Sequence, residues 1–138
     1  MNIRGHCHCG NIEFEMDWTG KTSELRGRTC SCSYCRMHGA SWTSHPEVSV
    51  TARIEDKEQI IVYRFGHQTA EFYVCAHCGI LPFASCGGED GRVAVVNINT
   101  FKDFKRDEID FATTNFDGES NPERLARRNQ NWSPLCIL

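Results

Sequence analysis

The spacing of the cysteines constrains this chain more than any other feature, because seven of the nine fall into three tight clusters. The clusters are Cys7-His-Cys9, Cys30-Ser-Cys-Ser-Tyr-Cys35 and Cys75-Ala-His-Cys78. A structural zinc site closes with four protein ligands, whereas a catalytic zinc keeps three and leaves one coordination position open. The simplest partition is therefore one closed site and one open site. The closed site takes Cys7, Cys9, Cys75 and Cys78, and the open site takes Cys30, Cys32 and Cys35.

Other interpretations of these thiols stay open at this point. They could be small buried side chains or free thiols without a metal. Iron–sulfur clusters also bind to thiolates, but the spacings do not match the usual ferredoxin patterns, so zinc is favoured. A fourth ligand could also close the triplet into a second structural site. The candidates for that ligand are Cys86, Cys136, His38 and His45.

Length and composition indicate one globular domain over residues 1–138, with 40% apolar and 24% charged residues. The net charge is -3, which argues against a nucleic-acid partner. The N-terminal residues lack the apolar stretch of a signal peptide, and no segment is apolar enough to span a membrane. We therefore expect a cytoplasmic protein, in a compartment where clustered cysteines bind metal more often than they form disulfides.

The hydrophobic pattern predicts a mainly antiparallel β fold with at most short helices. Residues 11–18 alternate apolar and acidic side chains, as a half-buried strand does. Further strands are predicted at 60–65, 70–75, 80–84 and 92–99, the third and fourth of the five flanking the Cys75–Cys78 turn. Asn121-Pro122-Glu123 predicts the start of a short helix over 122–128. One helical turn is predicted at 101–106, and the tail from Asn129 is predicted to be irregular.

The chemistry of an open site with three thiolates points to a sulfur substrate. Such a zinc ion is electron-rich and polarises water poorly, so a soft exogenous thiol is the natural fourth ligand. A bound thiolate adds negative charge and requires a nearby cation, for which Arg36 is the first candidate and Arg28 and Arg64 are others. Tyr34 and His38 are candidate proton donors because they neighbour the triplet in sequence.

The order of these residues resembles the glutathione-dependent formaldehyde-activating enzyme (Gfa) family, whose domain also occurs in centromere protein V. The resemblance covers about residues 3–115 and leaves about 116–138 as a C-terminal extension. The segments that carry it are Gly5-His-Cys-His-Cys-Gly10, Cys30-Ser-Cys-Ser-Tyr-Cys-Arg36, Gly39-Ala40, Tyr63-Arg-Phe-Gly66 and Cys75-Ala-His-Cys-Gly79.

The resemblance implies a zinc-stabilised β fold of the β-tent, Mss-four-like kind. It also implies a structural zinc on Cys7, Cys9, Cys75 and Cys78, and a catalytic zinc on Cys30, Cys32 and Cys35. The activity that it implies is of the carbon–sulfur lyase type. In that reaction glutathione, or a similar thiol, and formaldehyde, or another small aldehyde, form an S-hydroxymethyl adduct.

Two further classes of function are compatible with the sequence. The first is a binding module, which could be a non-catalytic carrier of glutathione or its adduct, or a zinc-stabilised module for protein interactions. The second is a nucleic-acid zinc ribbon, which the acidic balance disfavours. Cys32→Ser and Cys78→Ser separate a pure scaffold from an enzyme or a thiol binder. A pure scaffold should lose stability in both variants, whereas an enzyme or thiol binder should lose thiol binding but keep its fold in Cys32→Ser.

Overall fold

The computed structural model describes residues 2–20, 25–102, 109–116 and 118–138, and the fold is mainly β, as the sequence predicts. The strands are β1 (Ile3–His6), β2 (Ile12–Met16), β3 (Arg26–Cys30), β4 (Ser41–Thr43), β5 (Val50–Ile54), β6 (Ile60–Tyr63), β7 (Glu71–Cys75), β8 (Phe83–Gly88), β9 (Gly91–Asn97), β10 (Asp110–Thr114) and β11 (Ser133–Ile137). The helical elements are α1 (Ser33–His38), the 3-10 turn η2 (Ile98–Thr100) and α2 (Asn121–Asn131). No helix in the described part of the chain is long and apolar enough to span a membrane.

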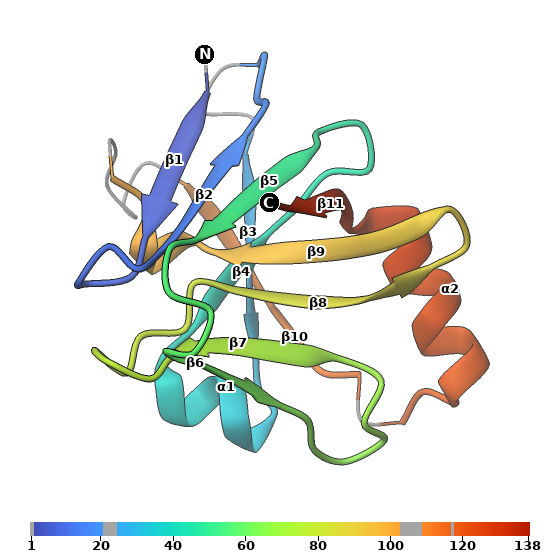
Figure 1. Ribbon diagram of the computed structural model, residues 1–138. Helices are drawn as coiled ribbons and strands as arrows, with labels where there is room; N and C mark the ends of the chain where they lie inside the picture. Colours follow the sequence, from blue (N-terminus) through green and yellow to red (C-terminus); the bar gives the residue numbers. More distant parts are fainter. Residues whose placement is uncertain (1, 21–24, 103–108, 117) are drawn as a thin grey trace.

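The strands form one sheet around β9 (Figure 1). The main path runs β1-β2-β5-β11-β9-β4-β3-β10, and β8, β7 and β6 continue from β9 in a second direction. Residues 93–97 of β9 are all buried, as expected of a β-branched run covered on both faces. Most pairings are antiparallel, as predicted, but β10 pairs with β3 and β11 pairs with β5 in parallel.

The predicted alternation in the first strands is confirmed. Ile12, Phe14 and Met16 of β2 are buried, and the glutamates between them are exposed. Antiparallel pairing places β2 between β1 and β5. The apolar face packs into the larger of two core clusters, which also holds Phe83 and Val96.

Strands β6 and β9 confirm the segments predicted at 60–65 and 92–99, and β7 confirms the strand that leads into Cys75. The strand predicted at 80–84 begins later, at Phe83. Two local features explain the delay. The chain first closes a turn in which Gly79 N–H donates to Cys75 O at 2.8 Å, and Pro82 has no N–H to donate to a strand ladder.

Helix α2 confirms the predicted helix and extends it to Asn131. Ser120 and Glu123 form a capping box, and Pro122 lies in the first turn, where its missing N–H costs nothing. Helix α1 was not predicted, because six residues are too few to show a helical period. Most of the helical turn predicted at 101–106 lies outside the described residues.

The irregular tail predicted from Asn129 is wrong. After α2 ends, β11 enters the middle of the sheet, where Ser133 and Pro134 pair with β9 and the next residues pair with β5 (Figure 1). Pro134 lies where the strand changes partner, so its missing N–H interrupts neither ladder. The C-terminal segment is therefore an integral part of the sheet rather than an appendage.

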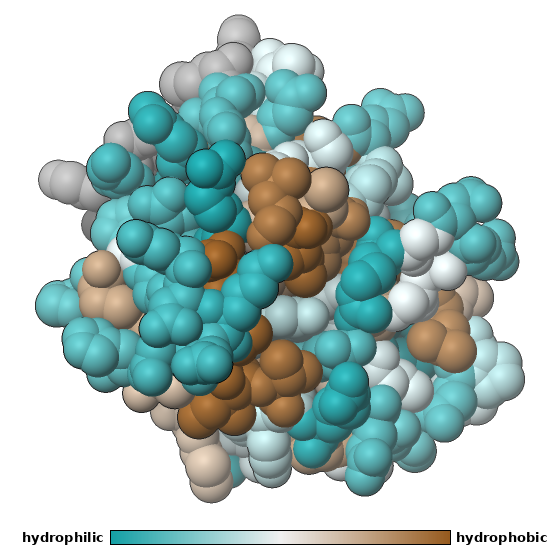
Figure 2. Space-filling view, viewed as in Figure 1, coloured by the Kyte–Doolittle hydropathy of each residue, from teal (hydrophilic) through white to brown (hydrophobic). Residues whose placement is uncertain are grey.

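The surface of the face in Figure 1 is largely polar and carries two apolar patches (Figure 2). One patch lies over β5 and β11, and the other lies near α1. The large apolar side chains that are exposed in the described part of the chain are Met37, Ile61, Tyr63, Ile80, Leu125 and Leu138. The cysteine clusters lie at turns between strands and around the start of α1, where side chains from different segments can converge.

Candidate metal centres and an adjoining cavity

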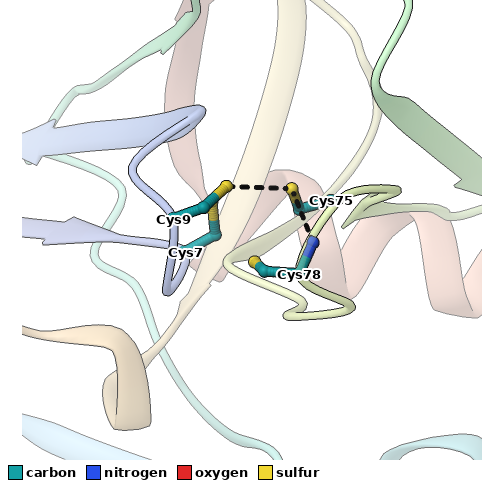
Figure 3. Close-up of side chains that lie close together, drawn as sticks. All are labelled: Cys7, Cys9, Cys75 and Cys78. Atoms are coloured by element: carbon teal, nitrogen blue, oxygen red, sulfur yellow. Dashed lines mark hydrogen bonds between the residues drawn. The ribbon is translucent and has the colours of Figure 1, made fainter.

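The four-cysteine cluster joins two distant turns. Cys7 and Cys9 lie between β1 and β2, and Cys75 and Cys78 lie where β7 turns toward β8 (Figure 3). The four sulfur atoms lie within 4.8 Å of one another. Cys7 and Cys75 are fully buried, whereas Cys9 is exposed. The cluster thus links segments that are far apart in sequence at the rim of the core.

Each turn uses the same backbone device to present its sulfurs. Cys7 N–H donates to Ile12 O at 2.9 Å, and Cys75 N–H donates to Ile80 O at 2.9 Å. Gly10 and Gly79 end the turns at φ 87° and 82°, a left-handed conformation that other residues rarely adopt. This repeated geometry explains why a glycine follows each of the two cysteine pairs.

The sulfur positions fit a tetrahedral cation. Zinc–sulfur bonds of about 2.3 Å in tetrahedral geometry place neighbouring sulfurs about 3.8 Å apart. The distance from Cys7 Sγ to Cys9 Sγ is 3.7 Å, and that from Cys9 Sγ to Cys75 Sγ is 3.6 Å. The donor set and its spacing are therefore compatible with zinc.

Without a cation, the Cys7 and Cys78 thiols ionise at different pH, as their pKa values show. Burial raises the pKa of Cys7 to about 12. Burial also acts to raise the pKa of Cys78, but hydrogen bonds from the backbone of Cys9 and Ile80, together with the Cys75 and Cys7 thiols, lower it to about 6. Cys78 therefore ionises at lower pH than Cys7, and a bound cation would favour the thiolate at Cys7 as well.

The three-cysteine cluster brings together Cys30, Cys32 and Cys35, whose sulfurs also lie within 4.8 Å of one another. Cys30 ends β3, Cys32 is the N-cap of α1, and Cys35 lies inside that helix. The Cys32 sulfur accepts a hydrogen bond from Cys35 N–H at 3.5 Å. The hydrogen bond with Cys30, burial and the nearby Cys30 charge raise the pKa of Cys35 far above its usual range, so this cluster also requires a cation to ionise fully.

Among the described residues, no fourth cysteine, histidine or carboxylate belongs to this group. None of the four residues considered as a closing ligand belongs to this group. His38 packs against the Tyr34 ring at 4.6 Å, and His45 lies against Trp18. Cys86 is buried in the smaller core cluster, which also holds Cys35, but its sulfur does not join the group, and Cys136 is exposed on β11. The cluster therefore offers a cation three protein ligands.

A cavity of about 380 Å³ adjoins the three-cysteine cluster, and all three of its cysteines line it. Trp42, Phe72, Val95 and Trp132 supply apolar walls. Four arginines supply positive charge: Arg28 from β3, and Arg124, Arg127 and Arg128 from α2. We call this space the arginine cavity. It is large enough for a small organic molecule and presents sulfur, aromatic and cationic groups to it.

Of the three arginines predicted to contact the substrate, one lines the arginine cavity. Arg28 lines the arginine cavity, whereas Arg64 forms an ion pair with Glu71 at 3.2 Å. Arg36 is exposed on α1 and does not line the cavity, so its contact with a substrate stays a prediction. Tyr34 and His38 do not line it either, whereas His67 does.

Sequence reasoning missed the arginines of α2. Arg127 and Arg128 follow Arg124 by three and four residues, spacings that place side chains on one face of a helix. That spacing could have been read from the sequence once the helix was predicted. The position of that face, against the three-cysteine cluster, comes only from the tertiary structure.

These features define a β protein with two cysteine clusters that can hold metal, one of them open to a cavity. The chain belongs to the glutathione-dependent formaldehyde-activating enzyme family, whose family model matches residues 2–116. A crystal structure of a Rhodobacter sphaeroides protein is similar with a TM-score of 0.61 and 24% identity, over 79% of this chain and 99% of that one. That likeness supports the fold alone. No curated protein matches the chain.

Proposed function

We propose that this protein joins glutathione, or a similar small thiol, to formaldehyde or another small aldehyde, and cleaves the carbon–sulfur bond of the adduct in reverse. The observation that carries the proposal is the three-cysteine cluster opening onto the arginine cavity. Family membership supports the same reaction class. This activity would make the protein a carbon–sulfur lyase-type enzyme.

The two clusters have different roles in this proposal. Cys7, Cys9, Cys75 and Cys78 hold a structural zinc ion that ties the β1–β2 turn to the β7–β8 turn. Cys30, Cys32 and Cys35 hold a catalytic zinc ion. When bound there, zinc supplies a coordination position for the substrate sulfur and keeps that sulfur ionised at neutral pH, where only about 3% of a free thiol is thiolate.

The side chains of the cavity position the second reactant. The apolar walls keep the aldehyde carbon close to the sulfur and displace water from it. The sulfur lone pair forms the C–S bond, the carbonyl π electrons move to oxygen, and that oxygen takes a proton. The thiol proton is released to solvent, so one thiol and one aldehyde give one adduct. His67 lines the cavity and is exposed, so we assign to it the transfer of a proton between solvent and the new hydroxyl oxygen.

The test is the exchange rate between ¹³C-formaldehyde and its glutathione adduct, measured by NMR with and without catalytic amounts of zinc-loaded protein. We expect exchange faster than the spontaneous rate in the wild type and at the spontaneous rate in Cys32→Ser. Cys136→Ser is the matched control, because it removes an exposed thiol on β11 that does not line the cavity. His67→Ala should lower the rate without changing thiol affinity.

A different outcome would favour the carrier function. If exchange proceeds at the uncatalysed rate with several thiols and aldehydes while the protein still binds thiol saturably, the catalytic proposal is wrong. If the wild type binds no thiol and Cys32→Ser loses stability, the scaffold function is favoured.

We place the activity in the cytoplasm. All nine cysteines, which all lie in the described residues, are free rather than paired in disulfides. A reducing compartment preserves this state and contains free small thiols. Fluorescence microscopy of the tagged full chain tests the location, and secretion of the protein would contradict it.

A further inference from the structure

The arginine cavity carries more positive charge than the protein itself neutralises. None of the described residues that line it is an aspartate or a glutamate. Glu119 pairs with Arg127 at 3.0 Å and lies 4.0 Å from Arg124. In the described part of the chain, Arg28 and Arg128 form no ion pair with a carboxylate. One carboxylate cannot neutralise all four arginines, and Arg28 and Arg128 are the two that lack a carboxylate partner.

Arg128 is held in a position that lacks a counter-ion. It is only 9% exposed, its Nη1 donates to Thr69 Oγ1 at 2.8 Å, and its guanidinium lies over the Trp132 ring at 5.0 Å. Its Nε has no hydrogen-bond partner among the described residues. Burial raises the pKa of the neighbouring Cys86 thiol, and the charge and hydrogen bond of Arg128 act against this rise without cancelling it. This sulfur is therefore a neutral contact of Arg128 rather than a counter-ion. A buried guanidinium with a free donor is costly unless a ligand anion completes it.

Arg28, on β3, lines the same cavity. Its Nη2 donates to Ser44 Oγ at 2.8 Å, a neutral acceptor. Burial, and then the charge of Arg127, lower the pKa of Arg28, which nevertheless stays protonated at neutral pH. Two such guanidiniums, one from β3 and one from α2, suit a ligand with more than one acidic group.

The positive wall comes mostly from outside the part of the chain that the family shares. The family model ends at residue 116, whereas α2 spans Asn121–Asn131. The ordered position of α2 is fixed by its capping box and by β11, which follows it into the sheet. The cavity therefore combines a sulfur site from the part of the chain that the family model matches with a charged wall from the C-terminal segment.

We propose that Arg28 and Arg128 form an anion-binding subsite, through which α2 selects small thiols that carry carboxylates over neutral or cationic thiols. The thiol part of this assignment rests on the proposed function, whereas the anion subsite does not. The apolar walls contact the body of the ligand, and the three-cysteine cluster, which lines the same cavity, receives its sulfur.

The experiment is a titration of the zinc-loaded full chain with glutathione, glutathione diethyl ester and cysteamine. Trp42 and Trp132 line the cavity, so tryptophan fluorescence reports occupancy, and calorimetry gives the same Kd independently. We expect the diester and cysteamine to bind at least about ten-fold more weakly than glutathione, because charge-assisted hydrogen bonds are lost. The affinity for glutathione should fall with added salt.

Protein variants locate the subsite. Arg128→Gln and Arg28→Gln should each reduce the preference for the acid over the diester. Arg53→Gln is the control, because this arginine is exposed on β5 and does not line the cavity. If Arg128→Gln fails to fold, the ligand series on the wild type still decides. Equal affinity for glutathione and its diester overturns the subsite.

The outcomes also separate this proposal from the catalytic one. Arginine-dependent binding of the acidic thiol without accelerated exchange supports the subsite and removes the enzyme. Accelerated exchange at equal rates for the acid and the diester supports the enzyme and removes the subsite.

Discussion

The sharpest test of unequal roles for the two clusters is the pair Cys32→Ser and Cys78→Ser. Cys32 is the N-cap of α1, and its sulfur accepts a hydrogen bond from Cys35 N–H. Serine is among the best N-cap residues, and a good cap contributes about 1 kcal/mol relative to alanine. The serine hydroxyl therefore preserves the cap of α1 while it removes one of three sulfur ligands.

Cys78→Ser acts on a different part of the fold. The four-cysteine cluster ties two turns whose sulfurs at Cys7 and Cys75 are fully buried. Structural zinc contributes roughly 10–16 kcal/mol of apparent binding free energy in small zinc-finger domains, which have little core of their own. This chain also buries two core clusters, so the loss of one ligand costs only part of that amount. Weakening that site by a fraction of this amount lowers the free energy of unfolding by about 3 kcal/mol or more.

The two variants should therefore differ in thermal stability. We expect the melting temperature of Cys32→Ser to stay within about 4 °C of the wild type. That of Cys78→Ser should fall by about 10 °C or more. Circular dichroism on zinc-loaded protein measures both, and elemental analysis counts the metal in each. Thiol binding, followed by tryptophan fluorescence, should be lost in Cys32→Ser. Equal destabilisation of the two variants would refute the division into a structural and a catalytic site.

Three further outcomes follow from the site. Elemental analysis of gently purified protein should give two zinc ions per chain, and a mild chelator should remove the ion of the three-cysteine cluster first; release of both at one rate would argue against an open site. In metal-free protein, hydrogen bonds from neighbouring backbone and thiol groups lower the pKa of Cys78 from its ordinary 9.0 to about 6. Its contribution to stability is complete above pH 9 and is lost as the pH falls through 6. Urea unfolding should therefore show stability rising between these values, and a flat profile would contradict it. Arg36→Gln tests the predicted contact with the substrate anion: weaker glutathione binding would support it, and unchanged binding would remove it.

Much of the fold could be predicted from local patterns. The alternation in β2 reports one buried face, and the Ser120–Glu123 capping box with Pro122 marks the start of α2. These signals are local because strand and helix periods act over a few residues. The prediction of an irregular tail was wrong because Pro134 and a short apolar segment are as compatible with a loop as with a strand. Only the gap between β5 and β9 gives that segment two strands to pair with.

The sequence by itself determined which sulfurs could act together, since two residues or fewer separate neighbouring cysteines within each cluster. Cysteines this close in sequence stay close in any fold. The division of the seven cysteines into a site of four and a site of three follows from the coordination number of zinc. Only the tertiary structure decided what the three-cysteine cluster faces. Arg28 and Arg128 are a hundred residues apart in the numbering, and no local pattern brings them to one cavity. The physical reason is that α2 is placed by the pairing of β11 and by packing over β8, both of which are contacts between distant parts of the chain.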